Sequence, residues 1–303
     1  MIAARRTPTA PKRAVAEAPP PAAGAPGGAP AAEAIAGAPA AEAVAVTPAA
    51  EAGPAVTSPQ HRLAFSILLH LLPGAALTLF MVLAAPAVRS LGFPVVFALF
   101  AGIGLVIVPI ELGYLLAHAK RTTGSFSLAS TVTYRERLPA RQLAGWTVAL
   151  FAWFMVCFVA STLWLDDWLA ATFFAWMPEA ILQFSAVADA GEPATAPVLL
   201  VLLVTAFVFN GVVGPLVEEL YFRGHLLPRI DRFGRWAPVL NTTLFSLYHF
   251  WTPWQNPARI LGFLPVAWMT WRKRSVQLSA VAHIVINLVF LLGMLGVFLG
   301  AVA

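Results

Sequence analysis

Two adjacent glutamates and an arginine stand where a strongly apolar run ends. The run PVLLVLLVTAFVFNGVV leads directly into GPLVEELYFRGHLLPRI, which contains Glu218, Glu219 and Arg223. Unpaired charge inside hydrocarbon costs several kcal/mol, so ionisable residues in an apolar span usually pair with one another or carry out chemistry. Glu219 and Arg223 share one stripe of a helix, whereas Glu218 projects roughly a quarter turn away. We therefore expect Arg223 to neutralise Glu219 and Glu218 to face other helices.

Further polar side chains lie in the apolar segments that follow. Phe245 and His249 share a helix face, as do His283 and Asn287. Their depth below the cytoplasmic face can be counted from the nearest basic or aromatic anchor, at about 1.5 Å rise per helical residue. The depths are roughly 16, 19, 13 and 19 Å for Glu218, His249, His283 and Asn287. A single buried His or Asn in a helix bundle is usually a satisfied interhelical hydrogen bond. The coincidence in depth favours a shared site instead.

The elements that must hold these side chains are membrane helices. Of 303 residues, 59% are hydrophobic and 11% are charged, whereas soluble domains carry about a quarter charged residues. A crossing needs about 20 apolar residues. Residues 168–185 are expected to lie at the membrane interface, and an eighth crossing there is the alternative. We predict an all-α, polytopic transmembrane helix bundle of about seven spans, at residues 63–87, 92–118, 143–164, 196–229, 236–252, 258–271 and 276–301.

The chain divides into three predicted parts. Residues 1–61 are rich in Ala, Pro and Gly and offer few large apolar groups to bury, which predicts a disordered tail. Residues 62–195 hold the first transmembrane helices and the interfacial segment. Residues 196–303 hold the polar side chains and form the predicted catalytic core. Lys and Arg gather in the tail and in alternate loops, so the positive-inside bias places the N-terminus in the cytoplasm.

Charge and cysteine content exclude several classes of function. The net charge is +5, but the basic residues lie between apolar spans rather than on one face. They are therefore topology signals, and we expect the lipid bilayer and no nucleic acid as a partner. Cys157 is the single cysteine, which excludes a disulfide framework or a cysteine-based metal site within one chain.

Three short motifs in order resemble those of a known family. EExxxR appears as EELYFR at Glu218–Arg223, FxxxH as FSLYH at Phe245–His249, and HxxxN as HIVIN at His283–Asn287. Each pattern alone recurs by chance. Together, in apolar segments, they resemble the CPBP intramembrane proteases, also called the CAAX protease and bacteriocin-processing (Abi) family, which includes the type II CAAX prenyl endopeptidases. The resemblance covers roughly residues 196–290.

The resemblance implies a role for each motif residue. Glu218, assisted by His249, would be the general base that activates a water, and burial makes a carboxylate a more useful base. His283 and Asn287 resemble the family's oxyanion-stabilising pair, whose donors lower the barrier in a dry site. The resemblance assigns a supporting role to the remaining residues of the constellation, which are Glu219, Arg223 and Phe245.

The cofactor prediction follows from the same residues. We expect no cofactor, because the family's glutamate–water mechanism uses these side chains without a metal. A divalent metal is the alternative, since Glu218, His249 and His283 would make an adequate zinc set. The HExxH pattern of zinc proteases is absent.

The sequence thus predicts an intramembrane endopeptidase of the cell membrane, plasma or inner, that opens to the cytoplasm. It would hydrolyse a peptide bond of a membrane-associated protein or peptide substrate. One alternative is a non-catalytic membrane scaffold or immunity factor. Another is a transporter with a buried Glu/His relay, which predicts paired discontinuous spans in two similar halves. The sequence contains no such repeat, and its polar residues cluster in one half.

Overall fold

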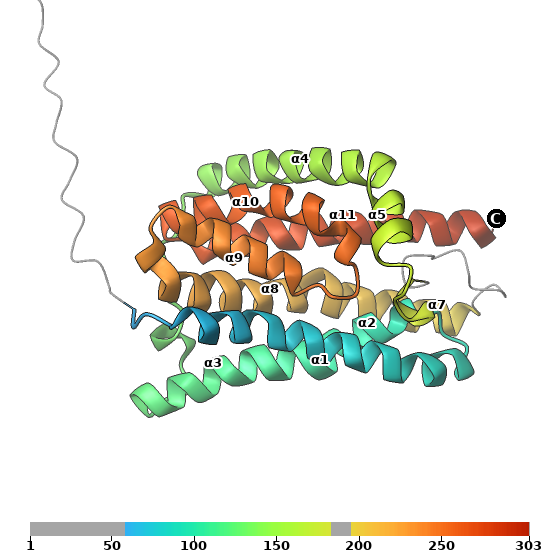
Figure 1. Cartoon of the computed structure of the whole chain (residues 1–303), viewed down its shortest axis with the longest axis horizontal. Helices are drawn as coiled ribbons and strands as arrows, with labels where there is room; N and C mark the ends of the chain where they lie inside the picture. The colour runs from blue at the N-terminus through green and yellow to red at the C-terminus, as the bar shows by residue number, and fades with distance from the viewer. Residues whose placement is uncertain (1–57, 183–194, 303) are drawn as a thin grey trace, which may run out of the picture. The chain divides into compact units, whose positions relative to one another are not determined.

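The computed structural model describes residues 58–182 and 195–302, and every named element in these ranges is a helix (Figure 1). This confirms the predicted all-α class. Residues 1–57, which make up most of the predicted tail, lie outside the described residues. The α-helices are α1 Leu63–Ser90, α2 Val96–Gly102, α3 Val108–Thr123, α4 Ala140–Trp164, α5 Asp166–Phe173, α6 Glu179–Leu182, α7 Ala196–Thr205, α8 Gly214–Glu218, α9 Trp236–Leu247, α10 Asn256–Lys273 and α11 Val276–Val302.

Five helical stretches are long and apolar enough to cross a membrane. In lipid every backbone N–H and C=O must be satisfied within the protein, which helices achieve segment by segment. The chain is therefore an integral membrane protein. Helices α9 and α10, at 12 and 18 residues, occupy two of the seven predicted spans but do not meet this criterion. The seven-span count stays a prediction. The five stretches are Leu63–Ser90, Val96–Thr123, Ala140–Trp164, Ala196–Phe233 and Val276–Gly293.

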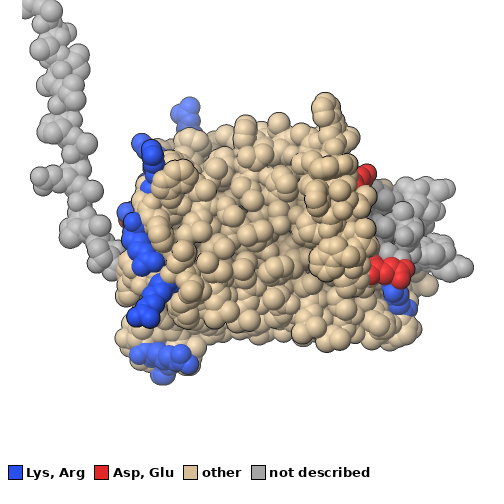
Figure 2. Space-filling view, in the orientation of Figure 1, with Lys and Arg blue, Asp and Glu red and all other residues tan. Residues whose placement is uncertain are grey.

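The surface of the helical unit is that of a protein in a bilayer. Large apolar side chains point outward along the spans; Leu83 is 70% exposed and Leu105 is 67% exposed. Figure 2 shows most of the Lys and Arg in view at one end of this unit, acidic side chains and further basic atoms at the other, and an uncharged belt between them. The last turns of α3 and α10 carry Lys120, Arg121, Arg272 and Lys273.

The stretch Ala196–Phe233 is a continuous helix whose winding changes along its length. Two π-helical segments, Ala206–Val213 and Glu219–Leu226, flank α8, and a 3₁₀ turn completes the stretch. Single-turn π segments occur frequently at functional sites in helices. The sequence indicated that 196–229 is too long for one simple crossing, and the structure forms one helix of 38 residues there.

The predicted interfacial segment, 168–185, contains no spanning helix in its described part. It forms the end of α5 and the four-residue α6. Helices of 8 and 4 residues reach only about 12 and 6 Å. An eighth crossing there is therefore not formed by residues 168–182, and residues 183–185 lie outside the described part of the chain.

Close helix packing brings the later segments together around α8. Helix α10 packs against α4 and α9, and α11 packs against α4, α8 and both π-helical segments (Figure 1). Helix α1 reaches the same region through Gly74, where an added Cβ would lie 1.9 Å from the backbone oxygen of Tyr248. The glycine therefore lets the chain after α9 lie directly on α1.

Candidate active site

A cavity of about 380 Å³ lies between α2, α4, α8, α10 and α11. Its walls are largely apolar, with Phe100, Phe154 and Phe263 among the side chains that line them. All four predicted catalytic residues also line this one cavity: Glu218, His249, His283 and Asn287. Residues that lie far apart in the sequence are thus brought to a single polar region inside an apolar enclosure, the usual character of small-substrate sites.

The cavity lies away from the basic end of the bundle. Arg259, near the start of α10, lines it, whereas Arg272 and Lys273 are in the last turn of the same helix. At 1.5 Å per residue this separation is about 20 Å. The opening of the cavity toward the cytoplasm stays a prediction.

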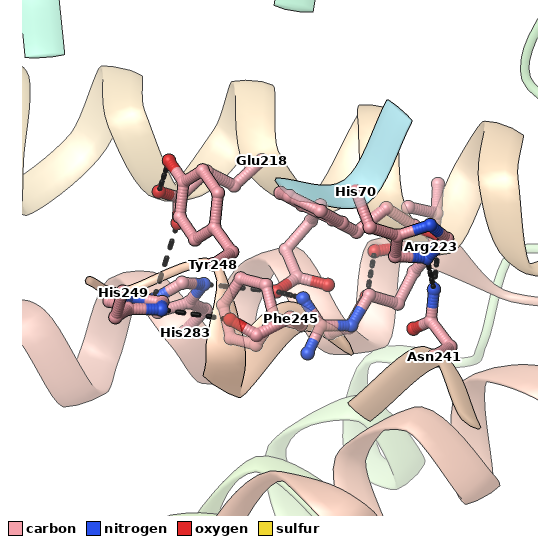
Figure 3. A network of polar contacts seen from close by, with 12 residues as sticks. His70, Glu218, Arg223, Asn241, Phe245, Tyr248, His249 and His283 are labelled. Carbon is pink, nitrogen blue, oxygen red and sulfur yellow. Dashed lines mark hydrogen bonds and ion pairs between the residues drawn. The ribbon is translucent and has the colours of Figure 1, made fainter. Parts of the chain in front are cut away.

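Glu218 is buried at the end of α8, where the winding changes to π. The Tyr248 hydroxyl donates a hydrogen bond of 3.0 Å to its Oε1. Its Oε2 lies 3.9 Å from Nε2 of His283 (Figure 3). As predicted, Glu218 faces other helices rather than a partner on its own.

Glu219 is completely buried and has two partners. Its Oε1 lies 3.1 Å from Nη1 of Arg223, which confirms the predicted pair within the helix. The same oxygen accepts a hydrogen bond of 2.9 Å from Nδ1 of His283. Because a carboxylate only accepts, Nδ1 must carry the proton, and Nε2 of a neutral His283 ring then faces Glu218 as an acceptor.

Phe245 explains how a completely buried arginine is held. The guanidinium of Arg223 lies 3.7 Å from the centroid of the Phe245 ring (Figure 3). Such cation–π contacts contribute roughly 2 kcal/mol or more when desolvated. The Phe245 ring also packs edge-to-face on Phe222 and stacks on Tyr248. Phe245 therefore supports the charged pair and the tyrosine that bonds Glu218.

His249 has one ring nitrogen committed and one available. Its Nδ1 donates a hydrogen bond of 2.8 Å to the backbone oxygen of Phe245, four residues earlier. The proton is thereby fixed on Nδ1, and Nε2 of the neutral ring is a base. Within the described residues no ion pair joins His249 to Glu218. Both side chains line the cavity, so a group bound in the cavity between them can contact both.

Asn287 is oriented by a main-chain oxygen. Its Nδ2 donates a hydrogen bond of 2.8 Å to the carbonyl of Asn210, which belongs to the π-helical segment Ala206–Val213. An amide nitrogen has two hydrogens, so a second one remains for a group in the cavity. Asn210 lines the cavity as well.

Sequence reasoning missed three polar residues of this region. Tyr248, which bonds Glu218, occupies a variable position of the FSLYH motif directly before His249. Asn210 is a single amide within an apolar run, a signal that could have been read. Arg259 lines the cavity from α10, in the segment whose basic residues were interpreted only as topology signals.

A second buried polar group visible in Figure 3 lies outside the cavity lining. Nδ2 of Asn241 lies 3.0 Å from Nε2 of His70, and His70 Nδ1 donates to the Ser66 carbonyl at 2.7 Å. Asn241 also donates to the Phe222 carbonyl at 3.0 Å. These bonds join α1 to α9 and to the π-helical segment Glu219–Leu226, as interhelical hydrogen bonds in membranes commonly do.

The residues offered as a zinc set do not form one here. In residues 58–182 and 195–302 no group of three or more His, Cys, Asp or Glu side chains is arranged to hold a metal ion. Zinc sites need three or four ligands at about 2.0–2.3 Å from one centre. We therefore derive no step that passes through a metal.

Comparison with protein families concerns the segment that carries the polar residues of the cavity. Residues 200–289 match the family described as type II CAAX prenyl endopeptidase Rce1-like. This part of the chain is similar to Rce1-like domains. It begins in α7 and ends in α11, so it contains all three motifs, and the predicted relation to CAAX proteases is confirmed. The Rce1-like family is a protease family. Comparison with curated proteins and with solved structures found no significant match.

Proposed function

We propose that this protein is an intramembrane endopeptidase in which Glu218 activates a water to hydrolyse a peptide bond. The observation that carries the proposal is the presence of Glu218, His249, His283 and Asn287 in the lining of one cavity. The match to a protease family over residues 200–289 supports the reaction class.

In the first step Glu218, with His249, orients a water in the cavity. The carboxylate takes one proton from the water, and the water oxygen forms a bond to the carbonyl carbon of the substrate. The neutral form of His249, with its proton on Nδ1, offers Nε2 as an acceptor for the second water hydrogen. Glu218 is held for this task by the Tyr248 hydroxyl.

In the second step the tetrahedral oxyanion is stabilised and then collapses. Asn287 offers its remaining N–H, and His283 can donate from Nε2 when its ring is doubly protonated, because Nδ1–H is committed to Glu219. The C–N bond breaks, and the proton held by Glu218 passes to the leaving amine. The products are a carboxylic acid and an amine, and the carboxylate of Glu218 is restored.

The substrate in this proposal is a membrane-associated protein or peptide. The cavity is lined by residues of helices long and apolar enough to cross a membrane, which favours segments already held at the membrane. We place the protein in the plasma or inner membrane with seven crossings and a cytoplasmic N-terminus, as the distribution of basic residues favours.

The test is cleavage of a co-expressed library of membrane-anchored peptides by the wild type and by Glu218→Gln at matched expression. Loss of products in Glu218→Gln is expected, because the amide cannot accept the proton. Glu136→Gln is the matched control, since Glu136 is exposed in the loop between α3 and α4. It should leave the products unchanged.

A chelator arm of the same experiment tests the mechanism. Unchanged cleavage by the wild type supports the glutamate–water route, and loss of cleavage with retained fold supports a metal. Equal products from wild type and Glu218→Gln would contradict the catalytic role of Glu218. The absence of any product from a broad library would favour the alternative function, a non-catalytic membrane scaffold.

A further inference from the structure

The cavity contains a buried cation that the proposed mechanism does not use. Arg259 lies in the first turn of α10, is 9% exposed, and lines the same cavity as Glu218. A guanidinium keeps its charge in proteins, so this position places a permanent positive charge beside the reacting groups.

All hydrogen-bond partners of Arg259 are neutral. Its Nη2 donates to Thr252 Oγ1 at 2.8 Å and to Gln255 Oε1 at 3.1 Å, and its Nη1 donates to Asn256 Oδ1 at 3.1 Å. No carboxylate lies within ion-pair distance of Arg259 in the part of the chain that the structure describes.

Two acidic groups act on Arg259 from beyond ion-pair distance, and both are engaged elsewhere. These are Glu218, which bonds Tyr248, and Asp166, whose carboxylate accepts from Ser161 Oγ at 2.6 Å. Arg223 differs, because this completely buried arginine has Glu219 at 3.1 Å. Among the described residues, the charge of Arg259 is thus solvated by neutral dipoles and has no counter-ion at ion-pair distance.

Stabilising the loop before α10 does not explain why residue 259 is positively charged. Three neutral oxygens could be satisfied by a neutral donor, and burying a cation costs far more than burying an amide. The three contacts do fix the planar guanidinium in one orientation. Both Nη2 hydrogens and one Nη1 hydrogen are committed to these contacts, so the fixed guanidinium offers a carboxylate its charge and the second Nη1 hydrogen.

We propose that Arg259 binds a carboxylate of the substrate and so determines which peptides are cleaved. This inference rests on the proposed peptidase function and adds the chemistry of the substrate. Two sources supply the same group: the free C-terminus of the substrate, or an Asp or Glu side chain near the scissile bond. In either case the ion pair forms in the cavity and fixes the position of the scissile carbonyl relative to Glu218.

The experiment uses peptide pairs that differ only in charge. One pair carries a free C-terminal acid or its amide, and a second pair carries Asp or Asn beside the scissile bond. Cleavage of each by purified wild type, Arg259→Gln, Arg259→Lys and Glu218→Gln is measured as kcat and KM. Arg137→Gln, at an exposed loop position, is the matched control.

We expect the wild type to prefer the acid of one pair by about tenfold to a hundredfold in kcat/KM, the range for hydrogen bonds to charged groups. In Arg259→Gln this preference should fall to near one, mainly through KM, while the neutral peptide is still cleaved. Arg259→Lys should retain part of the preference. The pair that shows the effect identifies the source of the carboxylate.

Two results would overturn the inference itself. Equal losses on acid and neutral peptides in Arg259→Gln would assign Arg259 to the loop alone, and a thermal melt would show the accompanying loss of stability. A wild type without preference in either pair would exclude carboxylate recognition. Failure of the wild type to cleave any peptide, or full activity of Glu218→Gln, would instead remove the proposed function, on which the inference depends.

Discussion

Nδ1 of His283 lies 2.9 Å from Oε1 of Glu219, although 64 residues separate them in the sequence. This contact gives the two adjacent glutamates different tasks. Glu219 fixes the ring orientation and the proton position of His283. The other ring nitrogen, Nε2, lies 3.9 Å from Oε2 of Glu218. A carboxylate that orients a histidine, which in turn serves the reacting groups, is a recurring arrangement in hydrolases.

We predict that Glu219→Gln lowers both stability and activity. Arg223 would remain as a buried cation without its partner, which costs about 3–5 kcal/mol. His283 would also lose the acceptor that fixes its tautomer. Thermal unfolding in detergent and kcat/KM on a cleaved peptide measure the two effects, with Glu136→Gln as control. The double variant Glu219→Gln/Arg223→Met should recover stability but not activity; recovery of both would show that Glu219 only balances charge.

The Tyr248 hydroxyl should matter for Glu218 and little for the fold. Tyr248→Phe removes the 3.0 Å hydrogen bond to Oε1 of Glu218 and keeps the ring that packs on Phe245. One hydrogen bond contributes about 1–3 kcal/mol when its partner is a charged group. We therefore expect kcat/KM to fall roughly tenfold, with an unchanged melting temperature within a few degrees. Full activity in the variant would show that Glu218 keeps its position without this bond.

The sequence was sufficient to predict the features that depend on the spacing of residues within one helix. The Glu219–Arg223 pair is a consequence of two residues four apart on one helix, and it forms as predicted. The helical class and the membrane assignment follow from apolar composition. The motifs also selected four residues that do line one cavity.

The remaining features depend on contacts between distant segments. That His283 bonds Glu219 as well as facing Glu218 depends on how α11 packs against α8 and the following π-helical segment. Tyr248 has no spacing that marks it as a partner of Glu218. The π-helical winding of 206–213 and 219–226 also follows from no simple residue pattern, because π segments depend on local packing rather than on propensity.

Gly74 is predicted to be intolerant of any side chain. A Cβ at this position would lie 1.9 Å from the backbone oxygen of Tyr248 and 2.7 Å from its ring. We expect Gly74→Ala to cost about 1–3 kcal/mol by overpacking and to displace Tyr248, which lowers activity. Gly113→Ala is the matched control on another helix, because an added Cβ there meets nothing within 4 Å. Equal melting temperatures and activities for the two variants would contradict this prediction.

His61, just before α1, should make the protein sensitive to acid. Burial, with Arg229 and His118 nearby, lowers the pKa of His61 from 6.5 to about 4. Above pH 6.5 the ring is neutral in both states and has no effect. Between pH 6.5 and 4 only the unfolded state gains the proton, so stability falls as the pH falls. Because the ring is only half-buried, we expect a loss of about 1 kcal/mol rather than the full value of the shift.

The measurement is thermal unfolding of wild type and His61→Gln at pH 7.5 and pH 5. The wild type should lose more stability between these values than the variant does. Subtracting the pH-dependent loss of the variant from that of the wild type cancels the contributions of other titrating groups and of the packing lost in the variant. An equal loss in both proteins would show that another group causes the acid sensitivity.

The π-helical winding of 206–213 has a consequence for changes in chain length. A π segment accommodates one residue more than α-helical winding over the same rise, so losing a residue there can return the segment to α winding with its flanks still aligned. A deletion within α8 would instead rotate everything that follows by about 100° and carry Arg223 away from Phe245. A one-residue deletion within Ala206–Val213 would therefore keep Glu218 directed into the cavity. It would move the Asn210 carbonyl and so remove the hydrogen bond that orients Asn287.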